Sequence, residues 1–330
     1  MPPEPAPDAV RSLADARADA RRAHDWDTAD RLKAEIEAVG WKVVDAGTMY
    51  DLVRAGVATV VDGGVVRYGS SEAVPSRLGE PAIGVATIVM VVSAPVADAI
   101  RGIDAVVAHG PAGTGLVLVS DGLDATDEAA LDAVAEDVTA AGDVTIEVVR
   151  TATRLGRAAA RDAGIRRATA PLVIVLDSSL ELRGDVVTPR VEALGDPSVA
   201  AAGAFGLVTE DLVRFEAAPP GQAAVEAIDG RLVAFRREDY AARGPLDERF
   251  GDDPYLDPWW SFVLRDLPDD ASDDAEPRRA LVVAGLPVAP ASADPFQTPG
   301  DAAARIRPRK GLYRFLKQFA TREDLLVERG

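Results

Sequence analysis

The chain has 330 residues, of which 48% are hydrophobic and 27% charged, a composition typical of a globular protein with one large and one smaller domain. Its net charge of −18 argues against a broad electrostatic grip on nucleic acid or anionic lipid, and the lack of cysteine excludes disulfides, thiolate nucleophiles and cysteine-bound zinc. No apolar run reaches the roughly 18 residues of a membrane span, and MPPEPAPDAV lacks the features of a signal peptide, so we expect a cytoplasmic protein.

The N-terminal part of the chain is predicted to form a small helical module. Residues 1–8 are rich in proline, and we expect them to be disordered. Two helices are predicted over 9–23 and 26–40, because apolar residues recur there at helical spacing and Gly40 provides a stop. The recurring residues are Leu13, Ala16, Ala20 and Ala23 in the first helix and Trp26, Ala29 and Leu32 in the second. Two such amphipathic helices bury their stripes against each other, which predicts a hairpin.

Short strands are expected to complete this module, which we place at residues 9–80. WKVVDAG and ATVVDGGVVRYG have strand character, with Asp62-Gly63-Gly64 as a turn. The segment AHDWDTADRLKAEIEAVGWKVVD resembles the C-terminal appendage of cysteinyl-tRNA synthetases, and a similar hairpin occurs in excision-repair proteins. A tRNA or nucleic-acid adaptor is therefore one hypothesis. However, residues 1–80 carry 10 basic and 14 acidic residues, a net charge of −4, which favours a protein-contact or fold-stabilising role.

From residue 83 the pattern changes to strands that alternate with helices. The strands are almost continuous runs of Val, Ile and Leu, as expected when both faces of a sheet are covered. Strands are predicted at 83–92, 116–119, 145–149 and 172–176, and helices at 97–108, 125–141 and 154–168. This alternation predicts an α/β fold with a mixed, mostly parallel sheet and helices on both faces. The half from 183 to 300 is less regular and is interrupted by Pro and Gly.

The segment 150–182 carries the most informative pattern. A helix containing Ala160-Arg161-Asp162-Ala163-Gly164 is followed by an apolar strand that ends at Asp177, and ligands bind at this end of strands in open α/β sheets. The segment resembles the centre of family-2 glycosyltransferases, where a Gly-x-Ala-x-Ala-Arg-Asn-x-Gly helix precedes a strand closing on Asp-x-Asp. The resemblance covers about 83–320. It implies a GT-A-type, Rossmann-like fold with a glycosyltransferase-like domain at 83–300.

The resemblance also implies a set of donor-binding residues. Asp121 and Gly122 correspond to the family's strand-closing signature beside the nucleotide base, and Arg161 would pair with the diphosphate. Asp177 and Ser179 occupy the Asp-x-Asp positions, which in the family hold Mg²⁺ or Mn²⁺. Ser179 departs from that pattern, and the segment 281–299 lacks the closing His of many relatives. The predicted metal ligands are therefore Asp177 and, two positions beyond Ser179, Glu181.

The acceptor side is predicted in the segment 227–266. It resembles the family's acceptor signature, which implies Asp257, and next Asp253, as the general base that deprotonates an acceptor hydroxyl. Asp257-Pro258 also fits a helix cap, and the two roles are compatible. The other acceptor-side residues are Asp247, Glu248, Trp259 and Trp260. The two tryptophans would either stack on a sugar or lie in the core.

These observations lead to one leading function and an alternative from another class. The leading hypothesis is a glycosyltransferase that moves a hexose from a nucleoside-diphosphate donor to a hydroxyl acceptor by single displacement. The alternative is a non-catalytic protein that retains the GT-A fold for binding or assembly, because Ser179 replaces the second Asp and the closing His is missing. Residues 301–330 predict a basic amphipathic helix, whose part 305–319 would contact a membrane surface or pack its aromatic side on the domain.

Overall fold

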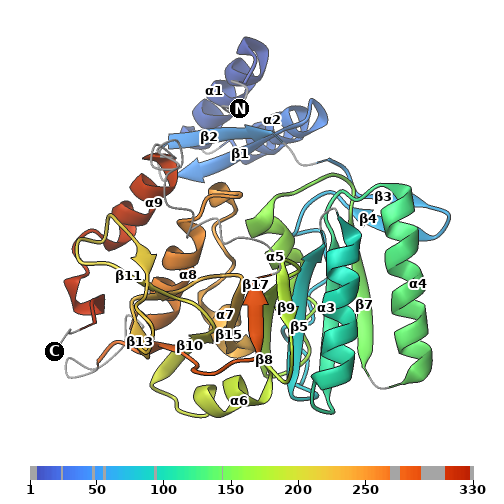
Figure 1. The fold of residues 1–330 in the computed structure, drawn as a ribbon. Helices are drawn as coiled ribbons and strands as arrows, with labels where there is room; N and C mark the ends of the chain where they lie inside the picture. The colour runs from blue at the N-terminus through green and yellow to red at the C-terminus, as the bar shows by residue number, and fades with distance from the viewer. Residues whose placement is uncertain are drawn as a thin grey trace. The chain divides into compact units, whose positions relative to one another are not determined.

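The computed structural model describes residues 6–23, 25–46, 49–54, 57–92, 95–142, 144–267, 276–290 and 309–327 (Figure 1). Two compact units are present, Met1–Val61 and Asp62–Gly330. Of the segment 1–8 that was predicted to be disordered, residues 1–5 lie outside the described residues, whereas Ala6 is buried and Asp8 begins α1. The first part of the C-terminal segment, 301–308, also lies outside the described residues. No helix in the described ranges is long and apolar enough to cross a bilayer.

The first unit contains a helical hairpin and a β-hairpin. Its elements are α1 (Asp8–Arg22), α2 (Trp26–Ala38), β1 (Trp41–Ala46) and β2 (Met49–Arg54), and the two strands are antiparallel. Helix α2 begins where the Asp25 side chain accepts a hydrogen bond from the Thr28 N–H at 3.1 Å. The buried face of α1 differs from the predicted stripe: it consists of Val10, Ala14, Arg17 and Ala20. The reason is that the core of this unit includes Ile36 and Trp41, which cluster with Val10 and Ala14.

The second unit has a large mixed sheet, and its first half alternates strands with helices. This half comprises β3 (Val60–Asp62, at the junction of the units), β4 (Val65–Tyr68), β5 (Ala86–Val92), α3 (Val96–His109), β6 (Thr114–Ser120), α4 (Ala125–Ala141), β7 (Thr145–Thr151), α5 (Arg157–Ile165) and β8 (Leu172–Asp177). The parallel strands β8, β5, β6 and β7 lie side by side in that order. Strand β4 is parallel to β7.

The second half extends the sheet on the other side of β8. It comprises β9 (Leu180–Leu182), α6 (Thr188–Leu194), β10 (Val199–Gly203), β11 (Gly206–Val208), β12 (Glu216–Ala217), β13 (Ala224–Val225), β14 (Ala227–Ile228), β15 (Leu232–Arg236), α7 (Arg237–Arg243), η1 (Glu248–Phe250), α8 (Leu256–Arg265), β16 (Arg279–Val282), β17 (Val288–Pro290), α9 (Arg309–Phe319) and η3 (Glu323–Leu325). Strand β15 is antiparallel to β8, and β10 follows it in the sheet. The predicted mixed, mostly parallel α/β fold is confirmed.

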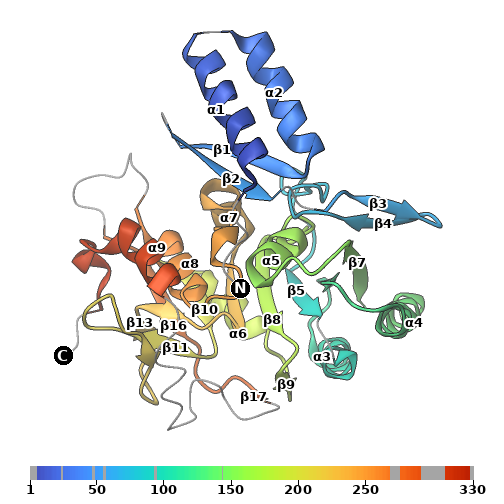
Figure 2. The ribbon, with the colours of Figure 1, turned by 90° about the horizontal axis from the view of Figure 1, so that it is seen from above.

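Helices cover both faces of this sheet, as Figures 1 and 2 show. Along β5, Ile88 and Met90 point into a core shared with α3, α4 and α6, whereas Val89 points into a core shared with α5, α7 and α8. Helix α5 approaches the sheet closely because Gly164 has no side chain. A Cβ at this position would lie 2.4 Å from Val89 Cγ1. The sequence patterning therefore places α5, with Arg161, directly against the central strands.

The C-terminal helix α9 packs its aromatic side on the domain. Phe315 and Phe319 are fully buried, and both rings lie edge-on to Phe262 of α8, at centroid distances of 5.1 and 5.3 Å. Tyr313 remains exposed. The aromatic face that a membrane contact would use is therefore covered along this helix, and a contact with lipid remains a prediction for the exposed lysines and Tyr313.

Candidate active site

The site lies where the parallel strands end. In register, Val91 of β5 pairs with Asp177 of β8, and Val92 pairs with Ser120 of β6, so these strands end at one edge of the sheet. Helix α5 begins after Gly156, and its first turn carries Arg157. The edge predicted from the sequence is therefore the place where α5, Asp177 and the residues that follow β6 meet.

Asp121 organises the loop that leads into α5. Its carboxylate accepts hydrogen bonds from the backbone N–H groups of Leu155 at 2.7 Å and Gly156 at 3.2 Å, and from the Thr151 hydroxyl at 3.2 Å. The adjacent Gly122 has φ +72°, and a Cβ there would lie 2.7 Å from the Arg154 nitrogen. Asp121 and Gly122 thus hold the β7–α5 loop in place, and they do so beside the predicted nucleotide site.

A buried ion-pair cluster forms the centre of the site. Asp257, in the first turn of α8, binds Arg161 through Oδ1 at 2.9 Å and Arg157 through Oδ2 at 3.0 Å. Burial opposes the negative charge of Asp257, but the two guanidinium groups lower the pKa of this carboxyl below its ordinary value. Arg161, which was predicted to bind the diphosphate, is itself buried and occupied by this pairing. Asp257 is therefore ionised and held on both oxygens.

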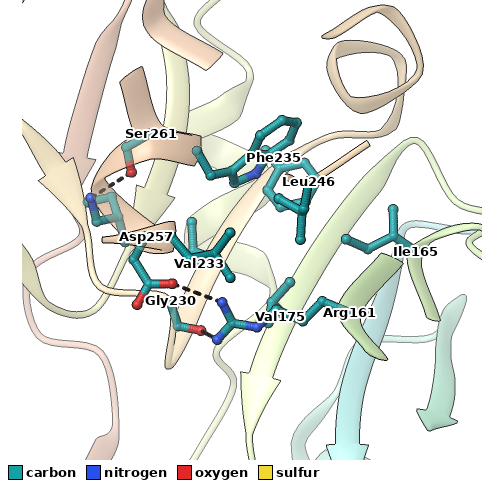
Figure 3. Close-up of a pocket in the computed structure, with 12 residues that line it drawn as sticks. Arg161, Ile165, Val175, Gly230, Val233, Phe235, Leu246, Asp257 and Ser261 are labelled. Atoms are coloured by element: carbon teal, nitrogen blue, oxygen red, sulfur yellow. Dashed lines mark hydrogen bonds and ion pairs between the residues drawn. The ribbon is translucent and has the colours of Figure 1, made fainter. Parts of the chain in front are cut away.

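Gly230 allows the backbone of the β14–β15 turn to approach this cluster. Arg161 Nη2 donates to the Gly230 carbonyl at 2.6 Å (Figure 3). A Cβ on Gly230 would lie 2.2 Å from Asp257 Oδ1 and 2.7 Å from Arg161 Nη1. A cavity of about 10 Å³, enough for one water molecule, lies against the Arg161–Asp257 pair and is lined mostly by apolar side chains such as Val233 and Leu246.

Asp229 is a buried carboxylate at this site that was missed in the sequence. Its Oδ1 accepts hydrogen bonds from the Arg231 backbone N–H at 2.8 Å and from Arg231 Nε at 3.0 Å. Among the described residues, its Oδ2 accepts none. Burial and the nearby charge of Asp257 raise the pKa of Asp229. The available signal was the Asp229-Gly230 pair, which lies one residue before β15.

The predicted metal ligands do not come together. Asp177 is half-buried, and its Oδ1 accepts a hydrogen bond from the Ser179 N–H at 2.9 Å. Glu181 is exposed on β9 and forms an ion pair with Arg183 at 2.9 Å. Within the described ranges, no group of three or more Asp, Glu, His or Cys side chains is arranged to hold a metal ion. One carboxylate with a neutral serine is a poor set of ligands for Mg²⁺ or Mn²⁺, so these residues do not fit the ion.

The remaining acceptor-side residues make structural contacts. Asp247 binds Arg249 and Arg314, and Glu248 accepts a hydrogen bond from the Ser71 hydroxyl. The carboxylate of Asp253 accepts a hydrogen bond from the Tyr255 N–H at 3.0 Å, and burial raises its pKa.

Both tryptophans of α8 lie in the core. Trp259 packs on Phe250 and donates its Nε1–H to Gln318 at 2.9 Å, whereas Trp260 packs on Phe235 and Tyr240. Neither ring has an exposed face, because both residues are buried. Both tryptophans therefore pack in the core, which is one of the two arrangements expected for them.

Asp162, next to the ion-pair cluster on α5, is a buried carboxyl group. It accepts hydrogen bonds from the Tyr240 hydroxyl at 2.6 Å and the Leu246 N–H at 3.0 Å, while its Oδ2 has no partner among the described residues. Burial raises the pKa of Asp162 to about 7. The folded protein therefore keeps a proton on Asp162 at pH values where the unfolded chain has released it.

This difference predicts a pH dependence of stability. Between about pH 4 and pH 7 the folded state binds more protons at Asp162 than the unfolded state, so the free energy of unfolding should fall as the pH rises, by up to about 4 kcal/mol. Urea unfolding from pH 4 to pH 8 should show that Asp162→Asn removes this slope. The exposed control Asp98→Asn should retain it, and an unchanged slope in Asp162→Asn would contradict the assignment.

Comparison with known proteins identifies the larger unit. Residues 100–238 match the family described as glycosyl transferase family 2. No curated protein matches the sequence. A solved mannosyltransferase, PcManGT from Pyrobaculum calidifontis in complex with GDP-Man and Mn²⁺, aligns with a TM-score of 0.51 and 18% identity, over 74% of this chain and 66% of that one. GalNAc-T7, solved with UDP, GalNAc and Mn²⁺, aligns with a TM-score of 0.49 and 15% identity, over 60% of this chain and 42% of that one.

The chain thus spans less than two thirds of the length of either of these proteins. The likeness of the mannosyltransferase in fold agrees with the mixed sheet of the larger unit. The larger unit therefore has a GT-A-like fold, and its residues 100–238 match the glycosyl transferase family 2 model.

Proposed function

We propose that this protein transfers a sugar from a nucleoside-diphosphate donor to a hydroxyl acceptor by single displacement. The observation that carries the proposal is the cluster of Asp177, Arg157, Arg161 and Asp257 at the carboxyl edge of the sheet, within and beside the family 2 domain. In α/β folds this edge is the ligand-binding edge. The donor base would lie beside Asp121 and Gly122, and its diphosphate would lie beside Asp177 and the start of α5.

The atoms and electron pairs of the proposed reaction balance without a cofactor. The acceptor hydroxyl oxygen forms a bond to the anomeric carbon, and its proton passes to a carboxylate of the protein. The bond between the anomeric carbon and the β-phosphate oxygen breaks, and the nucleoside diphosphate leaves with the electron pair. The protein contributes the carboxylate and the positive charge that stabilises the leaving group.

Two neighbouring carboxylates qualify as the proton acceptor. The family resemblance assigns this role to Asp257, whose two oxygens are both engaged by guanidinium groups. Asp229 is adjacent, has a raised pKa and has one oxygen that accepts no hydrogen bond from the described residues. A free oxygen and a raised pKa are what a general base requires, so the geometry favours Asp229, with Asp257 holding the two arginines in position.

This assignment predicts different kinetics for the two variants. Asp229→Asn should lower kcat for sugar transfer by about 10²- to 10⁴-fold and leave the affinity for the nucleoside diphosphate unchanged. Asp257→Asn should lower both kcat and the affinity for the nucleoside diphosphate, because Arg157 loses its partner. Release of UDP, GDP or dTDP from a panel of nucleotide sugars measures both effects. A wild-type kcat in Asp229→Asn would contradict the role of Asp229 and would assign the general base to Asp257.

A non-catalytic binding role is the second candidate function. It is favoured by the full occupation of Asp257 and by the incomplete set of metal ligands around Asp177. The same panel distinguishes the two functions. Nucleoside-diphosphate binding without release of product from any donor would support the binding role, whereas turnover that Asp177→Ala abolishes would exclude it.

A further inference from the structure

Arg157 is a cation at the site that no part of the family signature includes. Its Nη1 donates to Asp257 Oδ2 at 3.0 Å, and its Nη2 donates to the Asp253 carbonyl at 2.9 Å. Its Nε is buried and has no acceptor among the described residues. The side chain is 24% exposed, so it is fixed by its contacts and still reaches the surface of the site. A guanidinium group has five N–H donors, and the hydrogen bonds to Asp257 and to the Asp253 carbonyl engage only part of them.

The carboxylates around Arg157 do not form a set of free ligands for a divalent cation among the described residues. Three carboxylates, Asp177, Asp229 and Asp257, lie close enough to affect one another or the neighbouring arginines. A fourth, Asp252, accepts a hydrogen bond from the Arg157 backbone N–H at 2.8 Å. Three guanidinium groups accompany them, those of Arg157, Arg161 and Arg231. Sites for Mg²⁺ or Mn²⁺ gather several carboxylate oxygens that are free of such partners. Here both oxygens of Asp257 and one oxygen of Asp229 bind arginines, and Glu181 pairs with Arg183, so that Asp229 keeps a single oxygen that accepts no hydrogen bond from the described residues.

We propose that this chain binds its nucleoside diphosphate without a divalent cation, and that Arg157 supplies the positive charge that faces the diphosphate. The inference rests on the proposed donor site. It concerns the cofactor requirement of that site and the residue that replaces the cofactor.

The chemistry of Arg157 suits this role. The planar guanidinium presents parallel N–H groups to phosphate oxygens, and charge-assisted hydrogen bonds of this kind are stronger than neutral ones. Arg157 is also the first residue of α5, so the partial positive charge of that helix end adds to its own. Asp257 and the Asp253 carbonyl fix the group before a ligand arrives, which reduces the entropy lost on binding. A preorganised cation can also stabilise the charge that develops on the leaving diphosphate.

Calorimetric titration of UDP, GDP and dTDP tests the inference, with each nucleotide added once in EDTA and once in excess Mn²⁺. For the nucleotide that binds, the wild-type Kd should be the same in both buffers. Arg157→Gln should weaken binding in EDTA by about 10- to 100-fold, which corresponds to the loss of charged hydrogen bonds. In EDTA, the nucleotide affinity of Arg157→Lys should lie between those of wild type and Arg157→Gln. The matched control Arg279→Gln removes an exposed arginine that pairs with Asp196, and it should bind like wild type.

Each contrary outcome has its own meaning. Binding that requires Mn²⁺ would overturn the inference and leave the proposed function standing. Wild-type affinity of a folded Arg157→Gln in EDTA would overturn the role of Arg157. No binding of any nucleotide in either buffer would contradict the proposed function itself. The comparison of the two buffers uses wild-type protein alone, so it holds even if Arg157→Gln fails to fold.

Discussion

Asp257→Asn should lower the free energy of unfolding by about 3–5 kcal/mol, because it leaves the buried guanidinium group of Arg161 and the partly buried one of Arg157 without their shared counter-charge. The effect is large because Arg161 is buried and its remaining acceptor is the Gly230 carbonyl. The asparagine amide keeps one acceptor oxygen, replaces the other with an NH2 donor, and carries no charge to balance the guanidinium groups. Urea unfolding at pH 7 measures the loss directly.

The pH dependence adds a second readout for Asp257. Its pKa is lowered in the folded state, so its stabilising contribution is present at neutral pH and is lost as the pH falls through the folded-state pKa, below the ordinary value for aspartate. This is opposite in sign to the effect of Asp162. The control Asp98→Asn removes an exposed carboxylate that pairs with Arg101 and should change stability by less than about 1 kcal/mol. A similarly small loss in Asp257→Asn would show that the cluster does not hold the fold together.

Gly230→Ala should be destabilising by about 1–3 kcal/mol and should weaken nucleotide binding, because the added methyl group would occupy the space of the Arg161–Asp257 pair. The new Cβ would lie 2.2 Å from Asp257 Oδ1, and the carboxylate can move away only by releasing Arg161. Thermal unfolding and nucleotide titration of the same variant test both effects.

A glycine elsewhere in the same unit provides the control for Gly230→Ala. Gly79 has no atom within 4 Å of the position its Cβ would take, so Gly79→Ala should leave stability within about 0.5 kcal/mol of wild type. Equal behaviour of the two variants would contradict the close approach of the β14–β15 turn to the ion pair. The pair of variants therefore separates a steric effect at the site from a general effect of removing glycine.

The fold was predictable where local signals and tertiary packing agree. The helix predicted at 125–141 matches α4, because the Asp124 side chain caps its first turn and Gly142 ends it in the left-handed conformation. The helix predicted from 154 begins instead at Arg157, since Asp121 binds the Leu155 and Gly156 N–H groups and keeps that loop extended. The local sequence around residue 154 does not indicate this contact with Asp121, which is distant along the chain.

For the candidate site, the arrangement of the elements was predictable from the sequence, and the contacts between side chains were not. The rule that ligands bind at the carboxyl ends of parallel strands placed Asp177 and the start of α5 correctly at one edge. The pairing of Arg157 and Arg161 with Asp257 joins residues about one hundred positions apart, so spacing along the chain gives no sign of it. Asp229 was missed for the same reason, because its burial depends on segments that are distant in sequence.

The structure of the protein with a bound nucleoside diphosphate tests the account most directly. The nucleotide that raises the melting temperature most among UDP, GDP and dTDP should be used for crystallisation. The account predicts the diphosphate at the carboxyl edge of β5, β6 and β8, with its oxygens within hydrogen-bond distance of Arg157 and its base beside Asp121. A nucleotide bound at any other face of the sheet, or no thermal shift with any of the three, would contradict it.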